Sequence, residues 1–234
     1  MNKTGAAFSV RFLRNGDQIT VVRNVIDSAG NGAALFQVVD TETGTPTPDW
    51  TQTENQPIIQ IGIRSAAGYP TEITNVTWAY DGKTLNFTYN GSAWVTANNN
   101  SSFQARINGS YYELKIVNNL ASKDVVSNKQ ISYEISYVSN AHSDSLQGSI
   151  DVLIQQAGSN SHILQITTNR VELDASNTTA TLTAVAAFGS TPVSIGTNDY
   201  AIEWYQDNVK LSGQTGATLT VNRDMVSGGS IFVA

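Results

Sequence analysis

The sequence predicts an all-β protein: tandem β-sandwiches preceded by a β-rich N-terminal arm. Three observations predict it. Short runs of alternating apolar and polar residues recur along the chain, separated by turn-forming pairs such as Asp81-Gly82 and Asn90-Gly91. No window shows a sustained apolar period of 3.6 residues, which would indicate amphipathic helices. A tryptophan-centred pattern occurs twice, and such a long internal repeat is typical of tandem domains.

The first predicted element is the arm, residues 1–56, which we expect to act as an attachment segment. The runs FSVRFL and QITVVRNV flank Asn15-Gly16, a pair typical of two-residue hairpin turns, and AALFQVV follows. Residues 40–57 contain three of the chain's five prolines, and a residue before proline favours extended backbone. We therefore expect a proline-rich connector in which Trp50 docks on a neighbouring surface.

The second predicted element is a sandwich over residues 57–158. Its clearest strand is QISYEISYV, whose alternating isoleucines and tyrosines would share one face. Only NNLASKDVVSN is compatible with a short helical turn. A second sandwich is expected over residues 159–234.

The repeat relates the two sandwiches. WAYDGKTL begins at Trp78 and WYQDNVKL begins at Trp204, and both have Asp three residues later and Leu seven residues later. Asp-Gly or Asp-Asn before a strand predicts a tight hairpin turn, with the tryptophan and the leucine near the core. Downstream, YELKIV corresponds to ATLTVN, and DVVSNKQISY corresponds to DMVSGGSIFV.

These features, over about residues 57–234, resemble immunoglobulin-like β-sandwiches. The paired cysteines of antibody domains are absent, so packing alone would hold the sheets together. The alignment puts Ile131 and Ile231 where these domains carry a corner tyrosine. The second copy ends soon after Val233, so its last strand is missing by this count. Either the chain is a fragment, or a strand from another chain or from the arm fills the gap.

Composition excludes several classes of function. The net charge is −6 and the 13 Lys and Arg residues are scattered, so we expect no nucleic-acid binding. No run of 18 apolar residues predicts membrane insertion, and Arg11 and Arg14 interrupt any secretory signal. The absence of cysteine excludes disulfides, thiolate metal sites and a lipoprotein anchor.

No motif nominates a catalytic site, so we expect no enzyme activity, no cofactor and no metal site. The two histidines, His142 and His162, lie in polar segments that predict exposed loops. An alternative calcium site at Asp144, Asp174 and Asp199 stays open, although the ligand spacing typical of calcium loops is missing.

Aromatic residues supply the candidate contact residues: Trp50, Trp94, Tyr111 and Tyr112. Exposed Trp and Tyr side chains can stack on sugar rings or anchor protein contacts. The alternative is that these aromatics only cover a sheet.

The elements Gln37/Asp40, Pro48-Asp49-Trp50 and Gln56-Pro57, with the tandem sandwiches, resemble virion-associated head and tail proteins of phages of gut Bacteroidota. The resemblance implies a structural protein of the virion, assembled in the host cytoplasm and decorating the capsid or tail. Its partners would be other virion proteins, further copies of the chain and a host-surface glycan. It does not imply catalysis.

Two alternatives stay open. A bacterial surface adhesion or glycan-binding module would use the sandwich loops, but it should begin with a signal peptide or a lipoprotein anchor. An accessory domain of an enzyme would have its catalytic part beyond Ala234.

Overall fold

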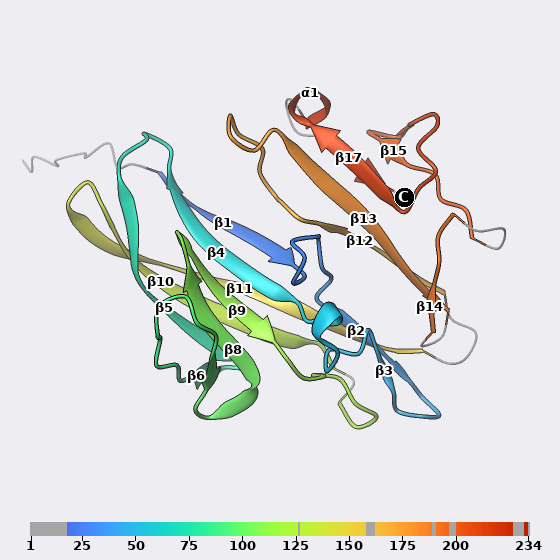
Figure 1. Cartoon of the computed structure of the whole chain (residues 1–234), viewed down its shortest axis with the longest axis horizontal. Helices are drawn as coiled ribbons and strands as arrows, with labels where there is room; N and C mark the ends of the chain where they lie inside the picture. The colour runs from blue at the N-terminus through green and yellow to red at the C-terminus, as the bar shows by residue number, and fades with distance from the viewer. Residues whose placement is uncertain are drawn as a thin grey trace, which may run out of the picture.

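The structure is a computed structural model that describes residues 18–125, 127–157, 162–188, 191–196, 200–226 and 232–233. Strands dominate these residues and form two β-sandwiches of two sheets each (Figure 1). The predicted all-β class is confirmed.

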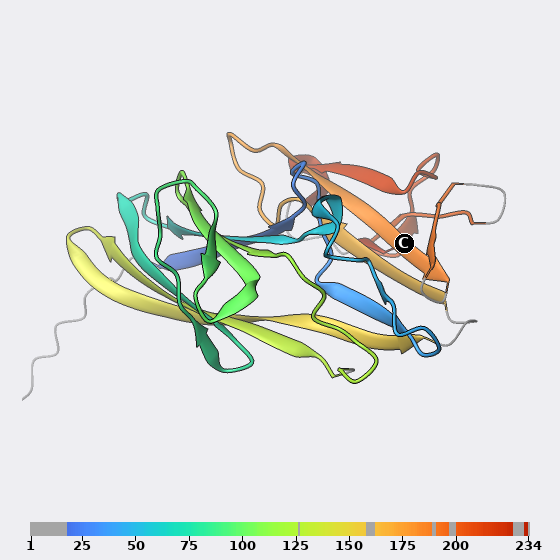
Figure 2. The ribbon, with the colours of Figure 1, turned by 60° about the horizontal axis from the view of Figure 1, so that its bottom comes forward.

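The first sandwich pairs a five-stranded sheet with a six-stranded sheet, which lie one above the other in Figure 2. The five-stranded sheet has the order β1 (Ile19–Ile26), β4 (Ile58–Ser65), β9 (Tyr111–Ile116), β8 (Asn100–Asn108), β7 (Val95–Ala97). The six-stranded sheet has the order β3 (Pro46–Thr47), β2 (Phe36–Asp40), β11 (His142–Ala157), β10 (Lys129–Ser139), β5 (Thr71–Tyr80), β6 (Lys83–Leu85). A 3-10 turn, η1 (Thr53–Asn55), precedes β4.

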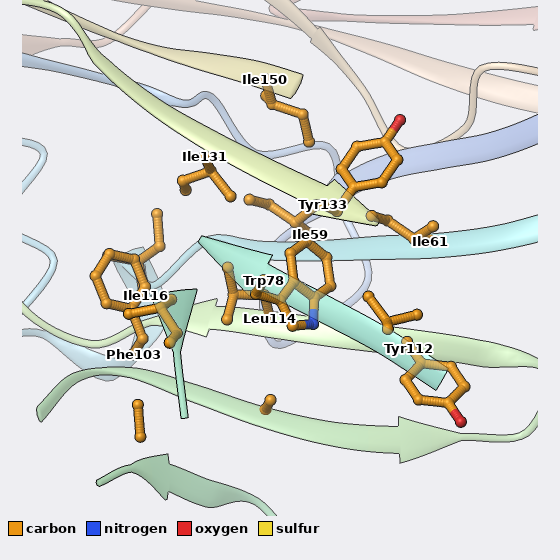
Figure 3. Close-up of a cluster of buried hydrophobic side chains, with 14 of the residues drawn as sticks. Ile59, Ile61, Trp78, Phe103, Tyr112, Leu114, Ile116, Ile131, Tyr133 and Ile150 are labelled. Carbon is orange, nitrogen blue, oxygen red and sulfur yellow. The ribbon is translucent and has the colours of Figure 1, made fainter. Parts of the chain in front are cut away.

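The core of the first sandwich lies between these sheets. Trp78 is fully buried in the middle of it, near Leu114 of the five-stranded sheet, and its ring meets Tyr133 edge-to-face at 6.1 Å (Figure 3). The predicted alternation of β10 is confirmed, because its isoleucines and tyrosines at 131, 133, 135 and 137 are all buried. The residues between them are more exposed.

The boundary expected after residue 56 does not separate two structural units. Strand β1 pairs with β4 along its whole length, and β2 pairs in parallel with β11, with Phe36 opposite Leu153. Phe36 and Val38 are buried. Residues 19–47 therefore supply strands to both sheets, because their apolar side chains gain burial there. The run FSVRFL and the Asn15-Gly16 turn lie outside the described residues.

The connector is held by a buried amide. Gln37 is fully buried, and its Nε2 donates to the Pro48 carbonyl at 3.0 Å and to Asn119 Oδ1 at 2.6 Å. Asn119 in turn accepts from the Trp50 backbone N–H and donates to Asp49 Oδ1. Trp50 docks as expected, with its side chain fully buried in the core.

The second sandwich is smaller. One sheet contains β12 (His162–Thr168), β13 (Thr179–Phe188) and β14 (Thr191–Val193), and β17 (Thr218–Asn222) also pairs with β13. The other has the order β16 (Val209–Lys210), β15 (Tyr205–Gln206), β18 (Phe232–Val233). A four-residue helix, α1 (Arg223–Val226), follows β17, and the fully buried Trp204 occupies the core with Leu219 and Val221.

Both predicted hairpins are confirmed. The turn residues Asp81 and Gly82 have φ of 45° and 75°, and Asp207 and Asn208 have φ of 49° and 67°. Positive φ at both central residues defines the tight turn that matches strand twist. Trp78 lies opposite Leu85, and the Trp204 carbonyl accepts from the Leu211 N–H at 2.8 Å.

The alignment beyond the hairpins was wrong by one residue. Tyr80, just before the first turn, pairs with Ile131, whereas Gln206, just before the second turn, pairs with Phe232. Phe232 therefore corresponds to Ile131, and Ile231 lies outside the described residues. In NNLASKDVVSN, the described residues make a bridge between Ser122 and Val125 and no helix.

The two sandwiches contact each other closely. Gly32 lies against β12, where an added Cβ would stand 2.5 Å from the carbonyl carbon of Thr168. Thr167 Oγ1 donates to the Gly32 carbonyl at 3.1 Å, and Asn24 Oδ1 accepts from the Val171 N–H at 3.2 Å. Apolar side chains from both sandwiches surround the buried Phe36. We call this contact region the junction.

Candidate binding face

The candidate site lies on the side of the five-stranded sheet that faces away from the core, which we call the outer face. Strand alternation produces it, because Ile59, Ile61 and Leu114 point inward and their neighbours point outward. Cross-strand pairing then brings the outward residues together. The outer face comprises Gln60, Gly62, Arg64, Gln104, Arg106, Asn108, Tyr111, Glu113 and Lys115.

A buried carboxylate organises the centre of this face. Glu113 is 1% exposed, and its Oε2 accepts from Arg106 Nε at 2.6 Å. Its Oε1 accepts from Gln60 Nε2 at 2.7 Å and from Asn108 Nδ2 at 3.0 Å. A buried charge is tolerated when it is paired and hydrogen-bonded, and losing a partner is costly. Glu113 therefore fixes side chains from both neighbouring strands, β4 and β8.

Trp94 lies over two cations of this face. Arg106 Cζ is 4.3 Å and Lys115 Nζ is 4.4 Å from the centroid of the half-buried indole ring, which is cation–π distance. Burial, and then the neighbouring charge of Arg106, lower the pKa of Lys115. These contacts fix the orientation of the ring.

Tyr111 covers a glycine on the adjacent strand. A Cβ added at Gly62 would lie 2.9 Å from Tyr111 Cε1, so the ring occupies the space that a side chain would need. Aromatic residues opposite glycine in neighbouring strands stabilise sheets in this way. The half-buried phenol is thereby held at the boundary between the outer face and the second sandwich.

A cavity of about 450 Å³ lies where the second sandwich meets the outer face, and we call it the junction cavity. Its wall includes Tyr111 from the first sandwich and Arg170 from the second. Arg64 joins the two walls, because its Nη1 lies 3.2 Å from Glu172 Oε2 and its Nη2 donates to Asp174 Oδ2 at 2.6 Å.

Hydrogen bonds keep Asp174 ionised. The backbone N–H groups of Asn177 and Ser176, then the Asn177 side chain, lower the pKa of Asp174, and the Arg64 charge adds to this effect. The Asp174–Arg64 pair is therefore present as an ion pair at neutral pH.

The structure divides the four predicted contact residues. Trp94 and Tyr111 lie on the same outer face, as required for a shared surface. Trp50 is fully buried and Tyr112 is 8% exposed, and both belong to the core. Tyr112 occupies an inward position of β9, where its ring meets the Tyr89 ring edge-to-face at 5.6 Å. Trp50 and Tyr112 are therefore not available as contact residues.

The sequence reasoning missed the charged residues of the site, chiefly Glu113, Arg106 and Lys115. Their alternation with apolar residues in SFQARI and YYELKIV predicts an outward position. Their mutual contacts depend on strand register, which no local pattern contains.

The residues considered for metal binding are the two histidines and the three aspartates at 144, 174 and 199. His142 and His162 begin strands β11 and β12 and are not in loops, and His162 packs on Phe188 at 4.6 Å. Asp199 lies outside the described residues. Among residues that the structure describes, no group of three or more His, Cys, Asp or Glu could hold a metal ion. None of the described helices is long and apolar enough to cross a membrane.

No protein-family model matches the chain, and no curated protein matches it. Inferences about function therefore rest on its residues and their geometry.

Proposed function

We propose that the chain is a non-enzymatic structural protein of a phage virion, which decorates the capsid or tail and holds two immunoglobulin-like sandwiches as one projecting unit. The observation that carries the proposal is the junction. A spacer must keep its domains in a fixed relation, and tightly packed contacts resist relative motion.

The strand order supports the immunoglobulin-like assignment. The order β1-β4-β9-β8 corresponds to the A-B-E-D sheet of that fold, and β5-β10-β11 corresponds to C-F-G. In the second sandwich, β12-β13-β17 corresponds to A-B-E and β15-β18 corresponds to C-F. The buried tryptophan then lies on or next to strand C in both sandwiches, as in immunoglobulin domains.

The contacts at the junction support a fixed arrangement of the sandwiches. Gly32 allows the backbones to approach closely, and the Arg64 ion pairs join the sandwiches on the side of the outer face. The interdomain contact therefore includes a close-packed part and a charged part. Its hydrogen bonds involve backbone atoms of both sandwiches, which fixes their relative position more firmly than flexible side chains would.

Attachment would use the N-terminal region, with other virion proteins and further copies of the chain as partners. Residues 19–47 form strands of the first sandwich, so removing residues 1–56 would delete part of the fold. The informative deletion is residues 1–17, which leaves every described strand in place.

The test is density-gradient purification of particles from a culture that produces the protein, followed by mass spectrometry. The full chain is expected to co-sediment with particles, and the variant lacking residues 1–17 is expected to remain in the soluble fraction. Circular dichroism and melting of the variant check that the sandwiches stay folded. A full chain absent from the particle fraction would contradict the proposal.

A second candidate is a bacterial surface module that binds a glycan, and the outer face favours it. Trp94 and Tyr111 lie on one face beside amide and charged side chains, a combination suited to the apolar faces and hydroxyl groups of sugars. Labelling of intact producer cells with a membrane-impermeant reagent separates the two candidates, because only a surface module would be labelled without cell lysis.

A further inference from the structure

The junction cavity has balanced charge. Arg64 and Arg170 bring two positive charges to its wall, and Glu172 and Asp174 bring two negative charges. A ligand with net charge would therefore gain one attraction at the cost of one repulsion. The wall instead favours a neutral ligand with many hydrogen-bonding groups.

Two buried polar atoms at this wall lack a hydrogen-bond partner among the described residues: Arg170 Nε and Glu172 Oε2. The first is a donor and the second is an acceptor, which has Arg64 Nη1 within ion-pair distance. Glu172 Oε2 is thus already paired with a charge, and neither atom has appreciable accessible surface, so a ligand would meet other polar atoms of these side chains. Hydroxyl groups, each able to donate and to accept, suit the guanidinium and carboxylate groups of this wall.

Tyr111 supplies an aromatic part of the cavity wall. Tyr111 is held against Gly62 and presents a ring beside the cavity. The nearby Asn24 is 7% exposed, and its Oδ1 accepts from the Val171 N–H, so this amide is also fixed. A flat ring in the same wall as hydrogen-bonding groups suits a ligand with one apolar face and polar edges.

The size and position of the cavity agree with a small ligand. Its volume of about 450 Å³ lies in the usual range for small-molecule sites, roughly 300–1,000 Å³, and such sites occur preferentially at domain interfaces. We infer that the junction cavity binds a neutral saccharide of one or two rings, with Tyr111 against a sugar face and Arg170 and Glu172 bonded to its hydroxyl groups. This inference deepens the second candidate function by naming its site and ligand class. It also holds if the protein belongs to a virion.

The test is saturation-transfer NMR on the purified full chain with glucose, galactose, mannose, N-acetylglucosamine, maltose, lactose and chitobiose, followed by titration of any ligand that binds. At least one of these probes is expected to bind saturably in the millimolar range or tighter. Arg170→Met is expected to weaken that binding at least tenfold. The matched control is Arg223→Met, which changes an exposed arginine of the same sandwich outside the cavity and should leave affinity within twofold.

A third variant, Tyr111→Ala, tests the aromatic wall, and its melting temperature shows whether the sheet is retained. Failure of all seven probes to bind saturably would overturn the inference, as would unchanged affinity in Arg170→Met. Glucuronate is the anionic counterpart of glucose, and tighter binding of glucuronate would overturn the assignment to a neutral ligand. The measurement uses the isolated chain, so its outcome is independent of whether the chain enters particles.

Discussion

The two sandwiches share one hairpin but place it in different surroundings. In the first, β5 pairs with β10 along nearly its whole length, and Trp78 is enclosed by two broad sheets. In the second, β15 pairs over only two residues with each neighbour, and Trp204 is enclosed by a much smaller described core. The hairpin is thus a local feature specified by a few residues, whereas the size of the core depends on strands from elsewhere in the chain.

The two tryptophans also differ in their polar atoms. Trp204 Nε1 donates to the Gly216 carbonyl at 2.9 Å, whereas Trp78 Nε1 has no hydrogen-bond partner among the described residues. The second sandwich therefore adds a hydrogen bond from its buried tryptophan to a smaller core.

The largest expected effect comes from removing these tryptophans. Trp78→Ala should cost about 5 kcal/mol of unfolding free energy and Trp204→Ala about 3 kcal/mol, because a large buried ring leaves a cavity and the first core is the larger one. Urea unfolding followed by circular dichroism measures both. Trp94→Ala is the control and should cost less than about 1 kcal/mol. Equal costs for all three would show that the enclosed positions are not core positions.

The second-largest effect is expected from adding a side chain to a glycine at the junction. Gly32→Ala places a methyl group in contact with the Thr168 backbone, so the sandwiches must move apart, at a cost of about 1–3 kcal/mol. Small-angle scattering should show an increased radius of gyration, and limited proteolysis should cut between the sandwiches more readily. Gly216→Ala is the matched control, since its added Cβ would have no neighbour closer than 3.8 Å. An unchanged scattering profile for Gly32→Ala would contradict the close junction.

Substitutions in the two hairpin turns should change stability by smaller amounts and with opposite signs. Gly82→Ala forces alanine to φ of 75° and should cost about 1–2 kcal/mol. Asn208→Gly relieves a non-glycine residue at φ of 67° and should stabilise the second sandwich by about 0.5 kcal/mol. Thermal melting of both variants checks the signs. Destabilisation by Asn208→Gly would show that the second turn differs from the first.

The smallest expected effect is a pH dependence at the junction. The folded-state pKa of Asp174 is lowered below its unfolded value, so its contribution to stability is present above about pH 4 and is lost as pH falls through the folded pKa. Melting temperatures measured across this acidic range should fall less steeply for Asp174→Asn than for the unsubstituted chain. Parallel curves would show that Asp174 does not stabilise the junction.

Local sequence predicted local structure well. The Asp-Gly and Asp-Asn turns and the inward face of β10 depend on neighbouring residues alone, and the structure confirms them. The place of β2 could not be predicted, because its parallel pairing joins Phe36 to Leu153, far apart in the chain. Parallel pairing leaves no hairpin signal in the sequence.

The candidate site was also predictable only in part. Trp94 and Tyr111 stood out as aromatic residues in polar surroundings. Trp50 and Tyr112 have similar sequence surroundings, yet both are core residues. For Tyr112, one step along β9 decides between the outer face and the core. Glu113, Arg106 and Gln60 come from three strands, and only the register brings them together.

The most direct test of the account is nuclear Overhauser spectroscopy on the isotope-labelled chain. Cross-strand signals are predicted between Trp78 and Leu85 and between Trp204 and Leu211, together with signals between Gly32 and Thr168. Two hairpins observed without any Gly32–Thr168 signal would show that the sandwiches are independent, and would contradict a chain that holds them as one unit.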